Sequence, residues 1–301
     1  MKDWIKKINK LSQRKKKYSQ WYQDTLIEYI FKNIGTTNKT PFCIEFGFNS
    51  NSLTEGTGAN VAKLVLEDGW DYLLLDGSFE NLSINLHKHF LTSENICKIF
   101  SEYKVPKIPE YISIDVDSTD LWLFEAVLKK YRAMLFSVEY NSHFPLNKAI
   151  TFPNDKNQYW DHNRAYGASL KALNLVAQNN GYSLLWVVSG FDAFFIRNDL
   201  IDDYSKEICF PFEKWKNCTN IVGHPPVKDK NNFSKFIDYE VYIRSNKNII
   251  KSQKEAQKVC EDYLMFNPLR DFVISPYKNF KNNIRKLSYA KIIEKLKYFK
   301  K

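Results

Sequence analysis

The sequence predicts an α/β fold with a doubly wound, mostly parallel sheet that ends in an antiparallel hairpin. Apolar runs without alternation, as parallel strands covered on both faces require, occur at 41–48, 71–78, 110–117 and 133–141. Segments with helical periodicity separate or follow these runs, at 60–69, 94–103, 121–131 and 169–180. Two final strands, 181–189 and 192–198, are separated only by Gly190 and Phe191, which indicates a hairpin.

An amphipathic helix is expected before the first strand, over residues 19–33. Gly35 and the polar residues after it then end the segment. The apolar side chains at helical spacing are those of Trp21, Leu26, Ile27, Ile30 and Phe31. A loop at 49–60 connects the first strand to the next helix, and the second strand follows that helix. These three elements form a βαβ unit.

We expect three regions in the chain of 301 residues, which is long enough for one substantial core. Residues 1–40 form an N-terminal helical extension and residues 41–200 a Rossmann-like catalytic domain. Residues 201–301 form a C-terminal extension that serves acceptor binding or oligomerisation. Periodicity is weak after Ile201, and only the last helix, 288–301, is predicted there.

Composition points to a cytoplasmic protein without a transmembrane segment. No apolar run approaches the roughly 20 residues that span a bilayer. The N-terminal stretch is cationic but has neither an apolar h-region nor a small-residue cleavage site. The five cysteines show no CxxC spacing, which favours reduced thiols over disulfides or a zinc site.

The formal charge of +10 is concentrated in lysines near the two ends of the chain. Such ends either attract nucleic acid, a membrane surface or a phosphorylated small molecule, or are simply solvated helix faces. No aromatic-interleaved RNA motif is present, so nucleic acid is a disfavoured partner. We expect a small-molecule acceptor, either a carbohydrate or a phosphorylated metabolite, and leave a homo-oligomer open.

Acidic and polar residues gather where the predicted strands end. Ligands of open α/β sheets bind outside the carboxyl ends of the strands, so these residues are the candidates for chemistry. They are Glu45 and Gly47, Asp76 and Gly77, Asp115 and Asp117, and Glu139 and Asn141.

Asp76 is the candidate for binding a cofactor ribose. It ends the second strand of a βαβ unit, where a carboxylate can accept hydrogen bonds from both ribose hydroxyls. The alternative is a turn aspartate, because Asp-Gly favours turns. The loop after the first strand contains Gly47, Asn49, Gly56 and Gly58 but lacks GxGxxG. Such a loop suits S-adenosylmethionine (SAM) better than a dinucleotide with its pyrophosphate.

The acidic cluster is also a candidate metal site. Side chains two residues apart in a strand share a face, so Asp115 with Asp117, and Glu139 with Asn141, can converge on one Mg²⁺. The ion would orient a substrate hydroxyl and lower its pKa. The alternative is helix capping of segment 121–131 by Asp117 or Ser118, with Asp120 at its positive end.

Two histidines are candidates for the general base. His143 follows Asn141 by two residues, and His162 lies in a long loop that can cover the site. Asp117 is the third candidate catalytic residue. Each histidine has a structural alternative, since a lone histidine is often a packed side chain.

Several blocks, taken in order, resemble the FkbM-like class I SAM-dependent methyltransferases. They cover much of residues 19–200. The blocks are 19–24 (SQWYQD), 42–50, 69–78, 93–100, 111–128, 136–141, 166–184 and 192–200. The resemblance implies a seven-stranded sheet with the terminal hairpin, SAM as cofactor, and methyl transfer to an oxygen, often of a carbohydrate.

The resemblance also implies roles for individual residues. Glu45 and Gly47 match the first SAM motif, Asp76 the ribose-binding acid, and Asp115 the acidic position beside the methyl donor. Related sequences often read D-x-D-G-x-D where this chain has DVDSTD, so Ser118 replaces a glycine. Because serine disfavours backbone conformations that glycine adopts readily, the sequence does not determine the local backbone conformation, nor the geometry of a metal site there.

We therefore expect a SAM-dependent O-methyltransferase that acts on a small sugar-bearing or phosphorylated acceptor, with Mg²⁺ as a second candidate cofactor. The alternative is a nucleotide-sugar glycosyltransferase that uses Asp115, Val116 and Asp117 as a DxD motif. A third hypothesis is a non-catalytic or RNA-modifying protein that uses its basic ends.

Overall fold

The structure is a computed structural model that describes residues 3–273 except 14–16, 56–58, 202–210, 222 and 234. The predicted helix at 288–301 and the loop glycines Gly56 and Gly58 lie outside the described residues. Among the described residues, no helix has the length and apolar character needed to cross a membrane. The described cysteines, which are Cys43, Cys97, Cys218 and Cys260, are free thiols.

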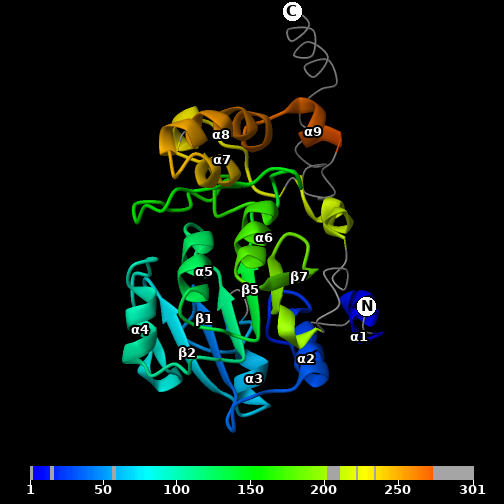
Figure 1. Cartoon of the computed structure of the whole chain (residues 1–301), viewed down its shortest axis with the longest axis vertical. Helices are drawn as coiled ribbons and strands as arrows, with labels where there is room; N and C mark the ends of the chain where they lie inside the picture. The colour runs from blue at the N-terminus through cyan, green and yellow to red at the C-terminus, as the bar shows by residue number, and fades with distance from the viewer. Residues whose placement is uncertain are drawn as a thin grey trace, which may run out of the picture.

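A seven-stranded sheet forms the centre of the molecule (Figure 1) and confirms the predicted fold class. Its order is β3-β2-β1-β4-β5-β8-β7; β1 to β5 pair in parallel, and β8 is antiparallel to both β5 and β7. The strands are β1 (Phe42–Phe46), β2 (Asp71–Asp76), β3 (Leu86–Lys88), β4 (Tyr111–Ile114), β5 (Leu135–Glu139), β7 (Tyr182–Val187) and β8 (Asp192–Arg197). The edge strand β3 was not predicted, because it is short and two of its three residues are polar.

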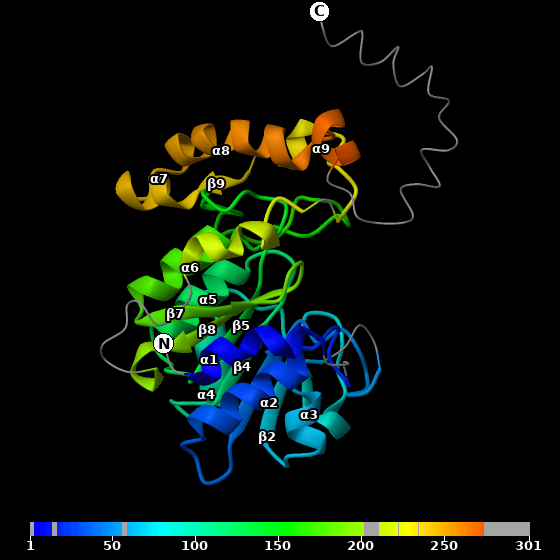
Figure 2. The same ribbon diagram turned by 90° about the vertical axis from the view of Figure 1, so that its right-hand side faces the viewer.

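Helices cover both faces of this sheet. One layer contains α4 (Ile96–Glu102), α5 (Asp120–Leu128) and α6 (Leu170–Asn179), and the other contains α2 (Gln23–Ile34) and α3 (Ala62–Leu66), as Figures 1 and 2 show. The central strands are therefore buried on both sides, and every residue of β4 is buried. The short elements are α1 (Asp3–Lys7), η1 (Ile8–Gln13), η2 (Leu82–Ile84), η3 (Asn198–Leu200), η4 (Phe212–Cys218) and η5 (Lys230–Asn232).

Helix α2 begins later than its sequence pattern predicted. The Asp24 side chain accepts hydrogen bonds from the backbone N–H groups of Tyr18 and Thr25, which folds the preceding residues into a turn. Trp21 therefore lies outside the helix and is 54% exposed, so its assignment to the apolar helix face was wrong. Leu26 and Ile30 are buried as predicted.

A second layer covers the carboxyl ends of the strands (Figure 2). It contains β6 (Ile150–Thr151), β9 (Ile237–Asp238), α7 (Tyr239–Arg244), α8 (Ile249–Leu264) and α9 (Pro268–Val273). Its separate core combines residues from the loop after β5, such as Phe144 and Phe152, with residues of the C-terminal region, such as Phe236 and Cys260. The C-terminal region and that loop thus fold as one layer.

A buried ion pair holds this layer together. Arg164, in the loop after β5, lies 3.2 Å from a carboxylate oxygen of Asp271 in α9, and both side chains are almost fully buried. Arg164 Nε also donates to the carbonyl of His224, 3.0 Å away. Asp271 accepts further hydrogen bonds from Arg270 Nε and from the backbone N–H of Asn267, so its charge is well compensated.

The sheet is closely packed where β1 and β4 end. Gly47 has φ +75°, and a Cβ atom built on it would lie 1.5 Å from the carbonyl oxygen of Asp115. Any side chain at this position would meet both a disfavoured backbone conformation and a backbone atom that cannot move away without displacing β4.

The substitution Asp271→Asn should lower the free energy of unfolding by about 3–5 kcal/mol, because Arg164 would remain buried without its charge partner. Urea denaturation of the full chain measures the loss. The matched control is Asp199→Asn, because the ion pair of Asp199 with Arg197 is short but 60% of the Asp199 side chain is exposed. We expect about 1 kcal/mol or less for the control. Equal losses for both variants would contradict the structural role of the buried pair.

The substitution Gly47→Ala should lower the free energy of unfolding by about 2–5 kcal/mol. This figure combines the cost of an alanine in the left-handed conformation with the steric overlap of its Cβ atom with the Asp115 carbonyl. Gly69→Ala is the control, because Gly69 also has positive φ (+69°) but has open space around its Cβ position. Only the backbone cost of about 1–2 kcal/mol is expected there. Urea denaturation compares them, and similar losses would show that β1 and β4 do not approach as closely as described.

Candidate functional site

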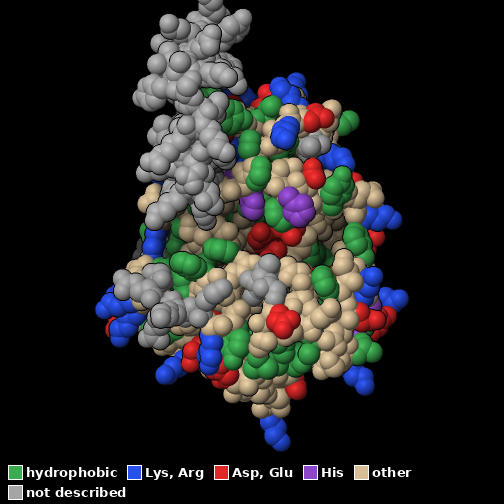
Figure 3. Space-filling model, turned by 180° about the vertical axis from the view of Figure 1, so that it is seen from behind, with side chains coloured by type: hydrophobic (Ala, Val, Ile, Leu, Met, Phe, Trp, Pro, Cys, Tyr) green, Lys and Arg blue, Asp and Glu red, His purple; other side chains and the backbone are tan. Residues whose placement is uncertain are grey.

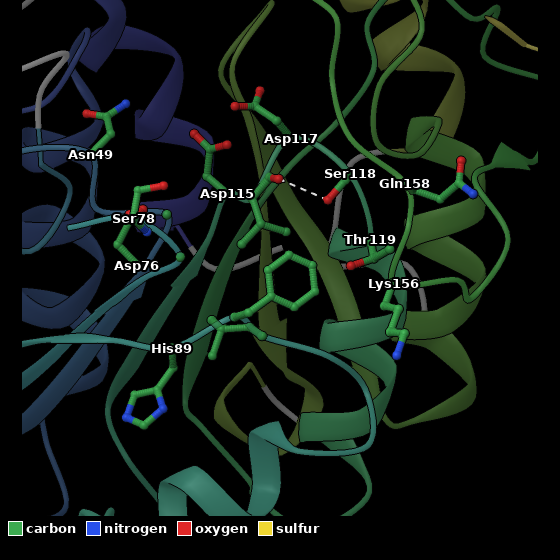
Figure 4. Close-up of a pocket in the computed structure, with 15 residues that line it drawn as sticks. Asn49, Asp76, Ser78, His89, Asp115, Asp117, Ser118, Thr119, Lys156 and Gln158 are labelled. Atoms are coloured by element: carbon green, nitrogen blue, oxygen red, sulfur yellow. Dashed lines mark hydrogen bonds between the residues drawn. The ribbon is translucent and has the colours of Figure 1, made fainter. Parts of the chain in front are cut away.

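A cavity of about 250 Å³ lies at the carboxyl ends of β1, β2 and β4. Figure 4 shows Asn49 and Asp76 across the cavity from Thr119, Lys156 and Gln158, with Asp115 and Asp117 at the end of β4. Of the sequence-predicted site residues, the cavity brings together Gly47, Asn49, Asp76, Gly77, Asp115 and Asp117. Glu45, Glu139, Asn141, His143 and His162 are not among its lining residues.

Asp76 serves the turn and the cavity at the same time. Its Oδ1 accepts hydrogen bonds from the backbone N–H groups of Ser78 (2.6 Å) and Phe79 (2.8 Å). This is the turn role that Asp-Gly predicted. No described residue donates to Oδ2, so one carboxylate oxygen remains for a ligand in the cavity.

One wall of the cavity was not predicted from the sequence. Phe90 and Leu91 come from the segment after β3, and Phe90 is 61% exposed although it is a large apolar side chain. Lys156 and Gln158 come from the loop after β5. The short strand β3 carries no recognisable pattern, so no sequence signal located the wall that follows it.

The loop that follows β4 is held by Asp120. Its Oδ1 accepts from the backbone N–H of Val116 (2.7 Å), and its Oδ2 accepts from that of Ser118 (2.9 Å). Burial raises the pKa of Asp120 to about 7, although these hydrogen bonds oppose the shift. The loop is therefore fixed by the first residue of α5.

The capping alternative for this loop was wrong. The N-cap of α5 is Thr119, and its side chain makes no capping hydrogen bond. Asp117 and Ser118 lie before the cap, while Asp120 lies in the first turn as expected. Asp117 takes the left-handed conformation (φ +57°), and Ser118 does not, so the backbone at position 118 does not require a glycine.

Three carboxylates converge beside the cavity. Asp115, Asp117 and Glu139 each offer an oxygen, and these oxygens all lie within 4.8 Å of one another. Oε2 of Glu139 is buried and has no hydrogen-bond partner in the described part of the chain. On this face of the molecule, Figure 3 shows acidic side chains next to histidines in a hollowed area.

Ionising all three carboxyl groups at the same time is unfavourable, because the charges are close together and partly removed from water. Burial, followed by the charges of Asp117 and Asp192, holds the pKa of Asp115 well above its usual value. Burial, followed by the charges of Asp115 and Asp117, does the same to the pKa of Glu139. Burial also raises the pKa of Asp117, against the charge of His162. A cation bound here would relieve this repulsion and displace protons.

Glu45 positions the end of the loop between β1 and α3 rather than lining the cavity. Its two carboxylate oxygens accept from the backbone N–H groups of Asn60 and Val61, each at 3.1 Å. Burial raises the pKa of Glu45 to about 7, although these two hydrogen bonds lower it. Its contribution to the site is therefore to fix the residues that precede α3.

Asn60 connects that loop to two further strands. Its Nδ2 donates to Ser113 Oγ in β4 (3.1 Å) and to Asp192 Oδ2 in β8 (2.9 Å). Burial raises the pKa of Asp192 to about 7, although the Asn60 hydrogen bond lowers it. No pattern in the sequence identified Asn60 or Asp192, because their contact depends on β8 lying beside β5.

The structure contradicts Asn141 as a metal ligand. Its Nδ2 donates to the carbonyls of Arg164 (2.9 Å) and Tyr166 (2.8 Å). Its Oδ1 accepts from the backbone N–H of His143 and lies 3.0 Å from His143 Nδ1. Both lone pairs of this oxygen are therefore used, and Asn141 instead ties β5 to the loop after it.

His143 as a general base was also wrong. It is 1% exposed, and its Nε2 accepts from the backbone N–H of His224 (3.2 Å). Burial, followed by the charges of His224 and Arg164, lowers the pKa of His143 well below its usual value. A neutral ring with both nitrogens engaged has no lone pair for a substrate proton.

Two other histidines, His162 and His224, are better candidates for a general base than His143. His162 is exposed, packs on Trp160 and acts electrostatically on Asp117. His224 was missed by sequence reasoning, because it lies in the weakly patterned C-terminal region. Its ring packs against Trp160 and Tyr166, with ring centroids 5.1 and 5.4 Å away, and its pKa is lowered by burial and then by Arg164 and His162.

His224 also lines a larger groove of about 1180 Å³. The groove runs past Ser142, after β5, and Gly190, at the tip of the β7–β8 hairpin, and reaches Tyr263 on α8. Its lining is mixed, with amide, hydroxyl and aromatic side chains. The groove and the smaller cavity both lie at the carboxyl ends of the strands, and they share no lining residue among the described residues.

Comparison with protein-family models and with curated proteins gave no match to this chain. The resemblance to FkbM-like methyltransferases therefore stays a prediction from the residue blocks.

Proposed function

We propose that the protein is a SAM-dependent O-methyltransferase that acts on a sugar-bearing or phosphorylated acceptor and is assisted by a divalent cation. The observation that carries this proposal is the cavity at the ends of β1, β2 and β4. It combines Gly47, Asp115 and a free carboxylate oxygen of Asp76 at the sheet edge where α/β proteins bind ligands.

The lining of the cavity fits SAM. Asp76 Oδ2 can accept from ribose hydroxyls, and Phe90 and Leu91 offer apolar surface to the adenine ring. The charged lining side chains in the described residues are three aspartates and Lys156, apart from the ionisable His89. This charge balance favours a cationic sulfonium over the anionic pyrophosphate of a dinucleotide.

SAM, when bound, supplies an electrophilic methyl group, and the residues of the chain have to present an acceptor oxygen to it. Asp115, Asp117 and Glu139 would hold Mg²⁺ with hard oxygen ligands, and the ion would lower the pKa of the acceptor hydroxyl. His162, whose charge acts on Asp117, and His224, which lines the groove, are the candidates for removing the proton. The groove beside His224, with a volume of about 1180 Å³, is the candidate site for the acceptor.

The glycosyltransferase alternative ranks second. Asp115 and Asp117 lie close enough for a shared cation, as a DxD motif requires. The antiparallel β8 between β5 and β7, however, has no role in that alternative, whereas it is an expected feature of class I methyltransferases. Affinity for UDP or CDP with Mn²⁺, without affinity for SAM, would reverse this order.

Asp76→Asn should weaken SAM binding about 10- to 100-fold, because hydrogen bonds to a charged group contribute about 1.5–3 kcal/mol. Asparagine keeps Oδ1 as an acceptor, so the turn at Ser78 and Phe79 is retained. Titration calorimetry with SAM and S-adenosylhomocysteine measures the affinity. Asp71→Asn, at the exposed start of β2, is the control and should bind normally. Unchanged affinity in Asp76→Asn would remove the ribose assignment, and no binding by the wild type would end the proposal.

Mn²⁺ should bind to the wild type and bind at least about tenfold more weakly to Glu139→Gln. The pKa values of Asp115 and Glu139 are raised, so binding displaces protons, and affinity should keep increasing with pH above the range in which ordinary carboxyl groups titrate. Titration calorimetry at a series of pH values measures both effects. Asp161→Asn, at an exposed carboxylate of the nearby loop, is the control. A pH-independent affinity that Glu139→Gln leaves unchanged would place the cation elsewhere.

A further inference from the structure

The turn between α7 and α8 presents apolar side chains to solvent. Ile243, Ile249 and Ile250 are 46%, 47% and 81% exposed. All residues of the segment 246–251 are exposed. Figure 2 shows this turn at the outer end of the layer that covers the sheet edge.

The turn is rigidly built, so its exposed isoleucines are a defined surface. Asn246 and Lys247 both have positive φ, and the Lys247 N–H donates to the carbonyl of Tyr242. Asn248 caps α8, because its side chain accepts from the backbone N–H of Lys251 at 2.9 Å. The opposite face of α8, including Ala256 and Cys260, is buried in the second core, so the protein's own packing does not use Ile249 or Ile250.

Unpaired cations surround these isoleucines. Lys247, Lys251 and Lys254 are exposed, and no described carboxylate forms an ion pair with any of them. The acidic neighbours Asp238 and Glu240 are engaged, because Asp238 caps α7 and Glu240 pairs with Lys171 and Arg244. Glu255 is the exposed acidic side chain on the first turns of α8.

We propose that this corner, defined by Ile243, Ile249, Ile250, Lys247, Lys251 and Lys254, docks on an anionic lipid surface. Isoleucines buried at the acyl boundary with lysines at headgroup level are the arrangement that interfacial helices use. A second copy of the chain fits less well, because a two-fold interface through this corner would oppose lysines with lysines. The proposal is independent of the methyl-transfer reaction.

Docking through the corner has a consequence for the groove. Tyr263, which lines the groove, lies on the same helix as Ile250, and a helix rises about 1.5 Å per residue. The side of the groove formed by Tyr263 would therefore lie within roughly 20 Å of Ile250 at the lipid surface. An acceptor carried on a membrane lipid would be within reach of such a site.

The test is co-sedimentation of the full chain with vesicles of phosphatidylcholine, with or without phosphatidylglycerol. The wild type should bind the vesicles with phosphatidylglycerol, and the double variant Ile249→Ser, Ile250→Ser should bind at least about tenfold more weakly. Lys251→Gln should reduce binding about fivefold, and added salt should reduce it further. Ile108→Ser is the matched control, because Ile108 is 43% exposed but lies before β4, at the opposite edge of the sheet.

Several results would overturn the proposal. These are no binding of the wild type to vesicles with phosphatidylglycerol, an equal loss for Ile108→Ser, or full binding by the Ile249→Ser, Ile250→Ser variant. The last result would assign the attraction to lysines elsewhere in the chain. Sedimentation equilibrium without vesicles tests whether the corner instead binds a second copy of the chain. A dimer that the double variant abolishes would also overturn the proposal. Urea denaturation confirms that the serine variants are folded.

Discussion

The close contact of Gly47 with the Asp115 carbonyl is the constraint on which the candidate site depends. It joins the ends of β1 and β4 so tightly that no Cβ atom fits between them. The strand ends of Asp76, Asp115 and Glu139 consequently share one edge of the sheet, since β2 and β5 pair in register with β1 and β4. A carboxylate at each end then becomes a cluster, and the cavity forms beside it.

So many carboxyl groups in one place repel one another when they are charged, and only some of them are stabilised by hydrogen bonds. Glu45 accepts hydrogen bonds from backbone N–H groups of the loop before α3, and Asp120 accepts them from the loop after β4. Among the described residues, none donates a hydrogen bond to the carboxyl groups of Asp115 and Glu139, and the buried Oε2 of Glu139 has no partner there. Carboxylates that are buried without donors favour a bound cation, and both a sulfonium and Mg²⁺ meet that requirement.

The second layer decides what surrounds the cluster. Asn141 and His143 belong to this layer's internal hydrogen bonding, with Arg164 and His224 as partners, and are therefore unavailable to a substrate. The same contacts hold the backbone of His224 and place its ring against Trp160 and Tyr166. The second layer thus engages Asn141 and His143 in its own hydrogen bonds, and it also provides His224 and the groove that His224 lines.

The sequence by itself determined the fold class, the hairpin and the residues at the strand ends. Apolar runs and glycines act locally, and the pairing of parallel strands then forces their ends to one edge. Only the tertiary structure decided which of those residues face a ligand. Glu45, Asn141 and His143 carry the right chemical groups, but their hydrogen-bond partners, such as Asn60 and His224, are distant in sequence. The short strand β3 and the C-terminal layer acquire their structure from packing against the rest of the chain, and no local periodicity records such contacts.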